Sequence, residues 1–581
     1  MHVRRRYPAV RCIRTPDVNI DSERRNFIRK PALTALFFCL LFILLGALWI
    51  RYPGIQNDEA LFAAPLYHPT WANYWVETRH VRIPIMLMSY LGALKSWIYA
   101  GVFHFFAPGP ASVRLPMLLA GALSVWLFFC LLARLAGDRA ALIGTALLAT
   151  DATYLLTIRC DWGPVAFQHL LLVSGLLLVV KYYQQGSILW LAGGFFLFGA
   201  GCWDKALFVW MLGGVAAGAV LVFPRELWRS LRPLNAAVAA LAFSAGASPL
   251  LIYNLAGPEP LGTLRGNLAW EISQLPAKAP FVTQSLSGST LFGYWSREDG
   301  DALPRDPETR LERVCLWLSG VSGKPRRNLL NPALLAALAA AALLWRTPVR
   351  RIVLFTLIAG AVAWLPMGAI RNAGGGVHHT VLLWPLPQLL IGAVFAEAAR
   401  RFGRAAPAMV TAAVVLVCGS NLLLLNNYYA RLIRNGGSVT WTDAIYPLSD
   451  YLKTVPARQV FSLDWGLIDP LRLLNRGHLE LGVGSEPFAK DAMSEEDRKE
   501  ARRMAAPGNL FLGHTEGNEF DPRVPRQLAA WAREEGCRKQ VLQVIRDRNG
   551  RAIFEVFRLE WISGPPTSRT PAPGPASRPG A

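Results

Sequence analysis

The chain has 581 residues, of which 53% are hydrophobic and only 17% are charged, and it contains 20 Trp and 28 Phe. This composition excludes an ordinary soluble enzyme and is typical of a membrane protein. The eight Cys show no paired spacing, which excludes a disulfide scaffold and a zinc ribbon. The net charge of +21 can reflect binding to nucleic acid, binding to anionic lipid, or signals that orient a membrane protein. The positions of the charged residues distinguish these explanations.

Residues 33–50 form the first predicted membrane span, because this apolar run is long enough to cross a bilayer. Nine Lys and Arg precede it against three acidic residues, which makes residues 1–32 a basic cytoplasmic tail. The alternative is a cleaved signal peptide. Since no small-residue cleavage site follows the run, we interpret it as a retained helix.

Ten further apolar segments complete a predicted set of about eleven spans. They are residues 112–133, 140–157, 164–180, 187–203, 206–223, 235–255, 329–345, 352–370, 380–397 and 407–425. The tail and the connections on its side of the membrane carry 21 basic against five acidic residues, so most of the positive charge is a topology signal. Nucleic-acid binding is excluded, because it needs a basic groove with interleaved aromatic residues on a folded domain.

Residues 84–107 are also apolar enough to span. A span here would invert the orientation of every later basic connection, so we expect one or two interfacial helices in a first outer loop, 51–111. Lys95 would then extend its amine toward water. A second long outer loop, 256–328, is a candidate lid, with Trp270 or Tyr294 and Trp295 as candidate sugar-stacking residues.

The region 427–563 alternates short apolar strands with helical stretches and is predicted to be a soluble extracytoplasmic α/β domain. Strands are expected at 459–463, 478–481 and 509–512, helices near 494–505 and 523–536, and a hairpin turn at 547–550. Residues 564–581 are predicted to be a disordered tail. The fold class is thus a polytopic α-helical membrane protein, with a transmembrane domain over 33–426 and a small C-terminal α/β domain.

Polar residues gather at the predicted outer ends of the spans, whereas the spans themselves contain almost no ionisable residue. The first such group is Asn57-Asp58-Glu59, in which one carboxylate can act as a general base while the other orients it. The alternative is a solvated acidic pair at the start of a loop.

The second group is Arg159-Cys160-Asp161-Trp162-Gly163-Pro164, in which Trp162 can stack on a sugar beside the Asp161 carboxylate. A salt-bridged helix end is the alternative. Asp151, deeper along the same predicted helix, is either a buried structural acid or part of the site.

The third group consists of cations that can hold a phosphate at headgroup depth: Lys205, Arg371, His378 and His379. The alternatives are an interfacial position for Lys205 and hydrogen bonds from the two His to the turn Gly374-Gly375-Gly376. A metal site is less favoured, because adjacent residues do not share a helix face.

These residues resemble the C-type glycosyltransferases of the protein O-mannosyltransferase and lipid A aminoarabinose transferase families, types 39 and 83. The resemblance covers most of residues 33–400. It rests on Asn57-Asp58-Glu59-Ala60, on Pro84 to Tyr99, on Asp161-Trp162-Gly163-Pro164, on Gly199 to Lys205 and on His378-His379 with Pro385 and Pro387. Trp203-Asp204 before Lys205 and the C-terminal domain depart from the mannosyltransferase pattern.

The resemblance implies a glycosyltransferase, hexosyl or pentosyl, that moves a sugar from a polyprenyl-phosphate donor to an acceptor with inversion at the anomeric carbon. Asp58 corresponds to the catalytic acid, Glu59 to its partner and Asp161 to a second acid. Lys205, Arg371 and His378 correspond to contacts of the carrier phosphate, and Arg159, Trp162 and His379 are further candidate binding residues.

The expected partners are this donor, a lipid, glycan or protein acceptor, and membrane lipid. No cofactor is required by this chemistry, although a divalent metal that bridges acids to phosphate stays open. The richness in Arg, Ala, Gly and Pro suggests a bacterial inner membrane with a periplasmic active face. The alternatives are a flippase or transporter of a lipid-linked sugar, disfavoured by the lack of charges within the spans, and a cell-envelope assembly protein.

Overall fold

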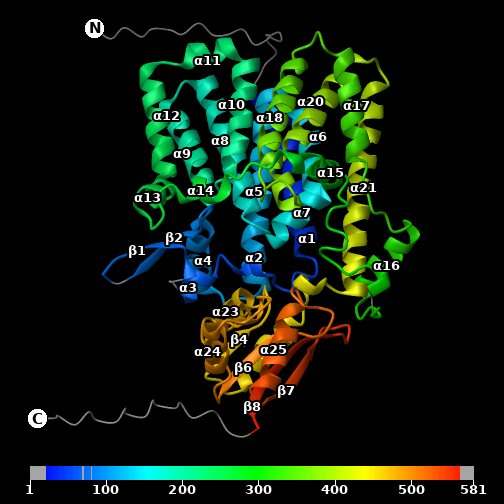
Figure 1. Ribbon diagram of the computed structural model, residues 1–581. Helices are drawn as coiled ribbons and strands as arrows, with labels where there is room; N and C mark the ends of the chain where they lie inside the picture. Colours follow the sequence, from blue (N-terminus) through cyan, green and yellow to red (C-terminus); the bar gives the residue numbers. More distant parts are fainter. Residues whose placement is uncertain (1–20, 69–70, 80, 302, 563–581) are drawn as a thin grey trace, which may run out of the picture.

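The computed structural model describes residues 21–68, 71–79, 81–301 and 303–562 (Figure 1). Most of the predicted cytoplasmic tail and the whole predicted disordered tail lie outside these residues. A bundle of long helices forms one part of the molecule, and a sheet with flanking helices forms the other (Figure 1). The segments α2, α3 and α4 of the first loop lie between the two (Figure 1).

The helices of the bundle follow the predicted spans closely. They are α1 (Asp21–Ala47), α5 (Pro110–Ala136), α6 (Asp138–Thr150), α7 (Ala152–Cys160), α8 (Val165–Gln185), α9 (Ile188–Asp204), α10 (Phe208–Val222), α11 (Pro224–Ser230), α12 (Pro233–Gly246), α13 (Ser248–Ala256), α17 (Leu330–Leu343), α18 (Val349–Ala369), α20 (Leu386–Arg401) and α21 (Ala406–Asn435). Helix α21 continues nine residues past 426, so the predicted domain boundary falls inside a helix.

Among the described residues, six helices are long and apolar enough to cross a membrane, or up to nine if each of three bent pairs is one span. The bent pairs are α6 with α7, α10 with α11, and α12 with α13. The two remaining predicted spans coincide with the shorter apolar helices α9 and α17. The protein is therefore a polytopic helical membrane protein, and length and composition support six to nine of the eleven predicted spans.

Glycines allow neighbouring helices of the bundle to pack with their backbones in contact. A Cβ atom at Gly199 of α9 would lie 2.1 Å from the Phe243 carbonyl oxygen of α12, and one at Gly246 of α12 would lie 2.0 Å from the Phe196 carbonyl oxygen of α9. Small residues at such positions are how helices associate in lipid, where apolar burial between helices supplies little driving force.

The predicted inner connections meet one another. Arg134 donates a hydrogen bond to Gln184 at 2.9 Å, which joins the connection after α5 to the end of α8. Arg351 forms an ion pair with Glu226 at 2.9 Å, which joins the start of α18 to α11. Helix α11 lies at the end of the bundle opposite to α2 and the C-terminal sheet (Figure 1). The connection formed by α11 therefore lies at the end of the bundle away from the first loop.

The first loop differs from its prediction. It contains α2 (Asn57–Ala60), α3 (Ala64–Tyr67), the three-stranded sheet β1 (Tyr74–Glu77), β2 (Arg82–Met88) and β3 (Leu91–Gly92), and helix α4 (Leu94–Phe105). The expectation of helix throughout 84–107 is therefore wrong for 84–92, where β2 pairs antiparallel with β1 and β3. Lys95 does not extend to water, because it is fully buried.

The long loop after α13 is folded onto the bundle. It contains α14 (Gly262–Asn267), η2 (Ile272–Gln274), α15 (Leu275–Leu286), η3 (Asp299–Asp301) and α16 (Arg310–Val321). The turn after α18 leads into α19 (Val377–Thr380) and η4 (Val381–Leu383). Trp270 pairs with Ile370 in an isolated β-bridge, which links the long loop to this turn.

The C-terminal region contains the predicted α/β elements, except that the strand expected at 478–481 lies at 481–483. They are η5 (Val439–Trp441), α22 (Ile445–Thr454), β4 (Gln459–Ser462), α23 (Ile468–Leu474), β5 (Leu481–Val483), η6 (Glu486–Phe488), α24 (Glu495–Met504), β6 (Asn509–His514), α25 (Arg523–Glu534), β7 (Cys537–Arg546) and β8 (Ala552–Trp561). The strand order is β5-β4-β6-β8-β7, with β4 parallel to β5 and β6 and with β8 antiparallel to β6 and β7. Two apolar clusters fill the sheet and helix interfaces.

The C-terminal region packs closely on the segment that leads into α2. The Gly54 amide donates a hydrogen bond to the Trp441 carbonyl at 2.8 Å, and a Cβ atom at Gly54 would lie 1.8 Å from the Thr442 carbonyl oxygen. Arg548 lies over the Tyr52 ring at 3.7 Å. Only a glycine fits at position 54, because any side chain would overlap the backbone of the C-terminal region.

Gly54→Ala should lower the free energy of unfolding by about 1–3 kcal/mol, because the added methyl group overlaps backbone that cannot move aside easily. Thermal unfolding of the purified protein in detergent measures this. The matched control is Gly101→Ala in α4, where nothing lies within 4 Å of the added carbon. A Gly54→Ala protein as stable as the control would contradict the packing described.

Candidate active site

Asp58 lies at the start of α2, a short turn fixed by its preceding residue. The Gln56 side chain accepts a hydrogen bond from the Asp58 amide at 2.7 Å, which caps the turn. The Asp58 Oδ2 atom accepts a hydrogen bond from Trp162 Nε1 at 3.0 Å. These contacts orient the half-buried carboxylate toward the turn after α7, although 103 residues separate the two in the chain.

Glu59 is fully buried and is bound on both oxygens by Arg114 of α5, at 2.6 and 2.8 Å. The same guanidinium donates to three backbone carbonyls, those of Ile50, Pro53 and Gly54. All five bonds fix the segment 50–59 to the bundle, and a bidentate pair of this kind is the strongest type of ion pair. Glu59 therefore has both carboxylate oxygens occupied by protein.

Asp161 ends α7 in a left-handed conformation with φ of 40°. Its carboxylate accepts a hydrogen bond from the Ala166 amide at 2.9 Å and forms an ion pair with Lys95 of α4. Both side chains are almost completely buried. The pair holds the turn 161–164 against the first loop, so the second predicted acid is also engaged by protein.

Trp162 connects the two sides of the site. Its ring stacks on Tyr294 of the long loop, with centroids 4.1 Å apart and planes 10° apart, and it lies 4.3 Å from the His378 ring. Its indole nitrogen binds Asp58 at the same time. Protein rings thus already contact Trp162, and its stacking on a sugar stays a prediction.

Lys205 follows α9 and lies against the same turn. A Cβ atom at Gly163, whose φ is +66°, would lie 3.3 Å from Lys205 Nζ and 3.9 Å from His378 Cδ2. The amine is buried, and Lys205 forms no ion pair with any other residue that the structure describes. Gly163 thus leaves room for the amine and the imidazole, which both lie close to the place that a Cβ atom would occupy.

Burial shapes the ionisation of Asp58 and Lys205, neither of which forms an ion pair with a described residue. It raises the pKa of the Asp58 carboxyl, against hydrogen bonds from Asn57 and Trp162 and the nearby positive charge of Lys205. It lowers the pKa of Lys205 to about 8, although Asp204, Asp58 and Asp161 favour the charged form. Near neutral pH the site therefore holds a charged amine close to a carboxyl group that binds protons more readily than usual.

A cavity of about 530 Å³ opens beside Trp162. Lys278 and Phe281 of α15, Arg371 and the glycines after it, and His378 and His379 contribute to its wall. Lys278 Nζ donates to the carbonyls of Ile370 and Arg371 at 2.6 and 3.2 Å, which fixes the glycine-rich turn. The buried Nδ1 atoms of His378 and His379 have no hydrogen-bond partner among the described residues, so the predicted bonds to the turn do not form from these atoms.

Arg371 lies at the rim of the cavity, where it forms an ion pair with Glu271 at 2.8 Å.

Several candidate residues lie outside this group. Arg159 donates to the carbonyls of Trp49 and Tyr52 and lies near the rings of Trp295 and Tyr429, at 5.6 and 5.3 Å from their centroids. Asp151 is a buried cap of α7 that accepts bonds from Trp384, Gln388 and the Tyr154 amide, which makes it structural.

Of the three aromatic residues proposed for the lid, one lines the cavity and two do not. Trp295 is 2% exposed, so its predicted stacking on a sugar is wrong, whereas Tyr294 lines the cavity. Trp270 is exposed but packs edge-to-face on Trp210, outside the cavity lining.

Sequence reasoning missed Arg114 and Lys278, and it placed Lys95 in water rather than in a buried ion pair. Arg114 carried a signal, because it is a charged residue inside a predicted span, as are Asp151 and His169. Each of these three binds protein groups rather than lining a path through the bundle. No feature of the sequence marked Lys278, because the turn that it binds lies 92 residues away in the chain.

No group of three or more His, Cys, Asp and Glu in the described ranges is arranged to hold a metal ion. The expectation that no metal is required stays a prediction.

Comparisons with known proteins agree with the resemblance drawn from the motifs. Residues 92–253 match the family model of the dolichyl-phosphate-mannose-protein mannosyltransferases, a segment that contains Lys95, Arg114, Asp161 and Lys205. A search of curated proteins found no match.

Solved structures share the fold over most of the chain. ArnT from Cupriavidus metallidurans in the apo state aligns with a TM-score of 0.56 at 14% identity, covering 92% of this chain and 98% of that one. The same protein bound to undecaprenyl phosphate aligns with a TM-score of 0.54 at 12% identity, covering 91% and 98%. The oligosaccharyltransferase of Archaeoglobus fulgidus tethered to an acceptor peptide gives 0.50 at 10% identity, covering 90% and 75%. The chain thus shares the fold of these solved structures and contains a segment that matches the mannosyltransferase family model.

Arg114→Met should destabilise the protein by about 3–5 kcal/mol, because it leaves the buried Glu59 carboxylate without its partner. Adding Glu59→Gln should recover part of the loss, since the uncompensated charge is then removed. Thermal unfolding of both variants in detergent tests this. If the double variant is no more stable than Arg114→Met, the buried charge is not the cause.

Proposed function

We propose that this protein is a membrane glycosyltransferase that moves a sugar from a polyprenyl-phosphate donor to an acceptor at the extracytoplasmic face. The observation that carries the proposal is the convergence of Asp58, Trp162, Lys205 and His378 from four distant parts of the chain on one turn beside a cavity. The shared fold with a protein whose structure was solved with undecaprenyl phosphate supports a lipid-linked donor.

The reaction proposed is a single displacement. The acceptor oxygen attacks the anomeric carbon, the bond from that carbon to the carrier phosphate oxygen breaks, and its electron pair stays on the phosphate. Asp58 takes the proton of the acceptor, because unlike Glu59 and Asp161 it forms no ion pair, and its raised pKa suits a general base. Attack from the face opposite to the leaving group inverts the configuration of the sugar.

Lys205 stabilises the negative charge that grows on the leaving phosphate. A buried amine close to that charge stabilises the transition state more than the ground state, because little water screens it. His378 and His379 offer ring nitrogens without partners at the cavity wall, and Arg371 offers a guanidinium at its rim. The carrier phosphate is thus assigned to this end of the cavity.

Glu59 and Asp161 have positioning roles in this proposal. Glu59 fixes the Asp58 turn through Arg114, and Asp161 fixes the Trp162 turn through Lys95. Neither carboxylate is free to take a proton from an acceptor without breaking a buried ion pair, which is costly.

Asp58→Asn tests the proposal. Cells that lack the protein should accumulate one lipid-linked sugar and lose one product, both measured by mass spectrometry of membrane extracts. Asp58→Asn should restore neither, with turnover reduced roughly 10²–10⁴-fold, while the purified variant still binds the accumulated lipid. The control Glu77→Gln, an exposed acid of the same loop, should restore both. Full complementation by Asp58→Asn would instead favour a transporter or an assembly protein.

The pH dependence of kcat/KM should reflect the two shifted groups. Activity should rise as Asp58 deprotonates and fall as pH increases through about 8, because Lys205 then loses its charge. Lys205→Arg should move the alkaline limb upward by roughly two pH units or more, since a guanidinium stays protonated. An unchanged alkaline limb in Lys205→Arg would show that another group is responsible.

A further inference from the structure

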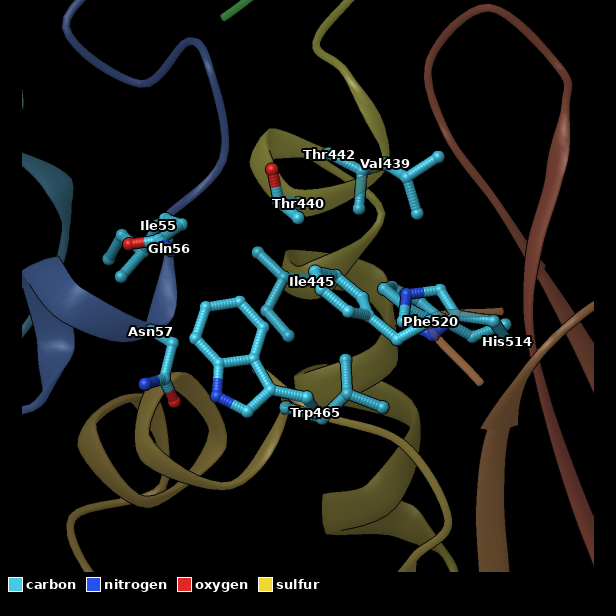
Figure 2. A pocket seen from close by; sticks show the side chains of 13 residues that line it. Ile55, Gln56, Asn57, Val439, Thr440, Thr442, Ile445, Trp465, His514 and Phe520 are labelled. Atoms are coloured by element: carbon cyan, nitrogen blue, oxygen red, sulfur yellow. The ribbon is translucent and has the colours of Figure 1, made fainter. Parts of the chain in front are cut away.

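We propose that Trp465 and Phe520 of the C-terminal region form a binding site for a neutral sugar ring of the acceptor, next to the Asp58 turn. The proposal rests on the proposed function and deepens it, because it names the chemical class of the acceptor. It is carried by the position, construction and charge of a small pocket between α2 and the C-terminal region (Figure 2).

The pocket lies directly beside the residue that precedes Asp58. Asn57 and Gln56 line one side, and Thr440, Thr442, Trp465 and Phe520 are among the residues on the other (Figure 2). Helix α23, which follows Trp465, packs on α2 itself. A group bound on these aromatic rings would therefore lie beside Asn57, the residue that precedes the proposed base.

One buried carboxylate organises both aromatic residues. Asp464 accepts hydrogen bonds from the Trp465 amide at 2.9 Å and from the Phe520 amide at 3.0 Å, and it binds His514 Nδ1 at 2.7 Å. The side chain of Asp464 is 8% exposed. The two rings lie 5.0 Å apart at 52°, although their residues are 55 positions apart in the chain. The site is thus held by a satisfied buried group rather than by chance proximity of two loops.

The rings remain accessible. Trp465 is 46% exposed and Phe520 is 54% exposed, and no other aromatic side chain in the described residues 445–562 is exposed to this extent. A folded domain usually buries such rings, because each hides a large apolar area. Exposed aromatic rings beside a proposed catalytic turn therefore point to a ligand with an apolar face.

The chemistry of the lining selects that ligand. None of the 13 described residues that line the pocket is Asp, Glu, Lys or Arg. The polar groups it offers are amides, hydroxyls and one imidazole, which exchange hydrogen bonds with neutral hydroxyl groups. A phosphate or carboxylate would find no cation in this lining. Aromatic faces with neutral hydrogen-bonding groups match a pyranose ring, whose C–H groups form an apolar face and whose hydroxyls lie at the edge.

The size of the pocket sets how the sugar binds. Its volume of about 20 Å³ holds roughly one water-sized group. The ring therefore stacks on Trp465 and Phe520 at the mouth, and a single hydroxyl enters between Asn57 and the C-terminal region.

Saturation-transfer NMR on the full-length protein in nanodiscs tests the site. The probes are the methyl glycosides of glucose, mannose and galactose, with glucose 6-phosphate as the charged comparison. We expect saturation of ring protons for at least one neutral glycoside, reduced at least threefold in Trp465→Ala and in Phe520→Ala. Trp465→Phe should keep at least half of the signal, which separates loss of the aromatic face from loss of the fold.

The matched control is Trp228→Ala on α11, where an indole that is 80% exposed lies at the opposite end of the molecule. It should leave the signal unchanged. The proposal is overturned if no neutral glycoside is saturated, if Trp465→Ala and Trp228→Ala behave alike, or if glucose 6-phosphate is the better ligand.

Binding is measured without turnover, so the two proposals fail separately. If the glycoside signal depends on Trp465 but the protein transfers no sugar, both the acceptor role and the proposed function are refuted. Transfer that depends on Asp58 without saturation that depends on Trp465 would refute only this site.

Discussion

The buried ion pair between Arg114 and Glu59 is the interaction on which the site depends. Arg114 binds both oxygens of Glu59 and three carbonyls of the segment before it, so one side chain of a helix sets the path of the chain into α2. In a buried environment such a pair is strong only when its remaining hydrogen-bonding groups are satisfied, as they are here. Asp58, one residue earlier, is consequently held in place without having to form a pair of its own.

The same arrangement is repeated on the other side of the site. Lys95 and Asp161 form a second buried pair, which fixes the turn that carries Trp162 and Gly163. Two acids and two cations are thus used for structure, whereas Asp58 and Lys205 form no ion pair and are the groups to which we assign the chemistry. This division follows from burial, because an unpaired charge is tolerated only where a substrate or a proton can compensate it.

The C-terminal region adds a third constraint. It contacts the segment 50–57 through Gly54, Tyr52 and the pocket beside Asn57. The base, the donor cavity and the proposed acceptor surface therefore belong to three different parts of the chain that meet at one end of the bundle. An arrangement of this kind lets the acceptor site change without disturbing the ion pairs that hold the base.

Local pattern in the sequence predicted the elements that depend on local physics. Apolar runs located every helix of the bundle except α11, and the alternation after 427 located β4, β6, α24, α25 and the final hairpin, because burial against lipid or a sheet face leaves a periodic signal. Asp58, Trp162, Lys205 and His378 could be selected as polar residues at helix ends.

What each polar residue does was decided by tertiary structure. Glu59 looked equivalent to Asp58 until Arg114 was seen to bind it, and Lys95 looked solvated until Asp161 was seen beside it. Trp465 and Phe520 carried no signal, because an exposed ring looks in sequence like a buried one. Pairing between distant residues depends on where the backbone brings them, and a pattern of neighbouring residues contains no record of that.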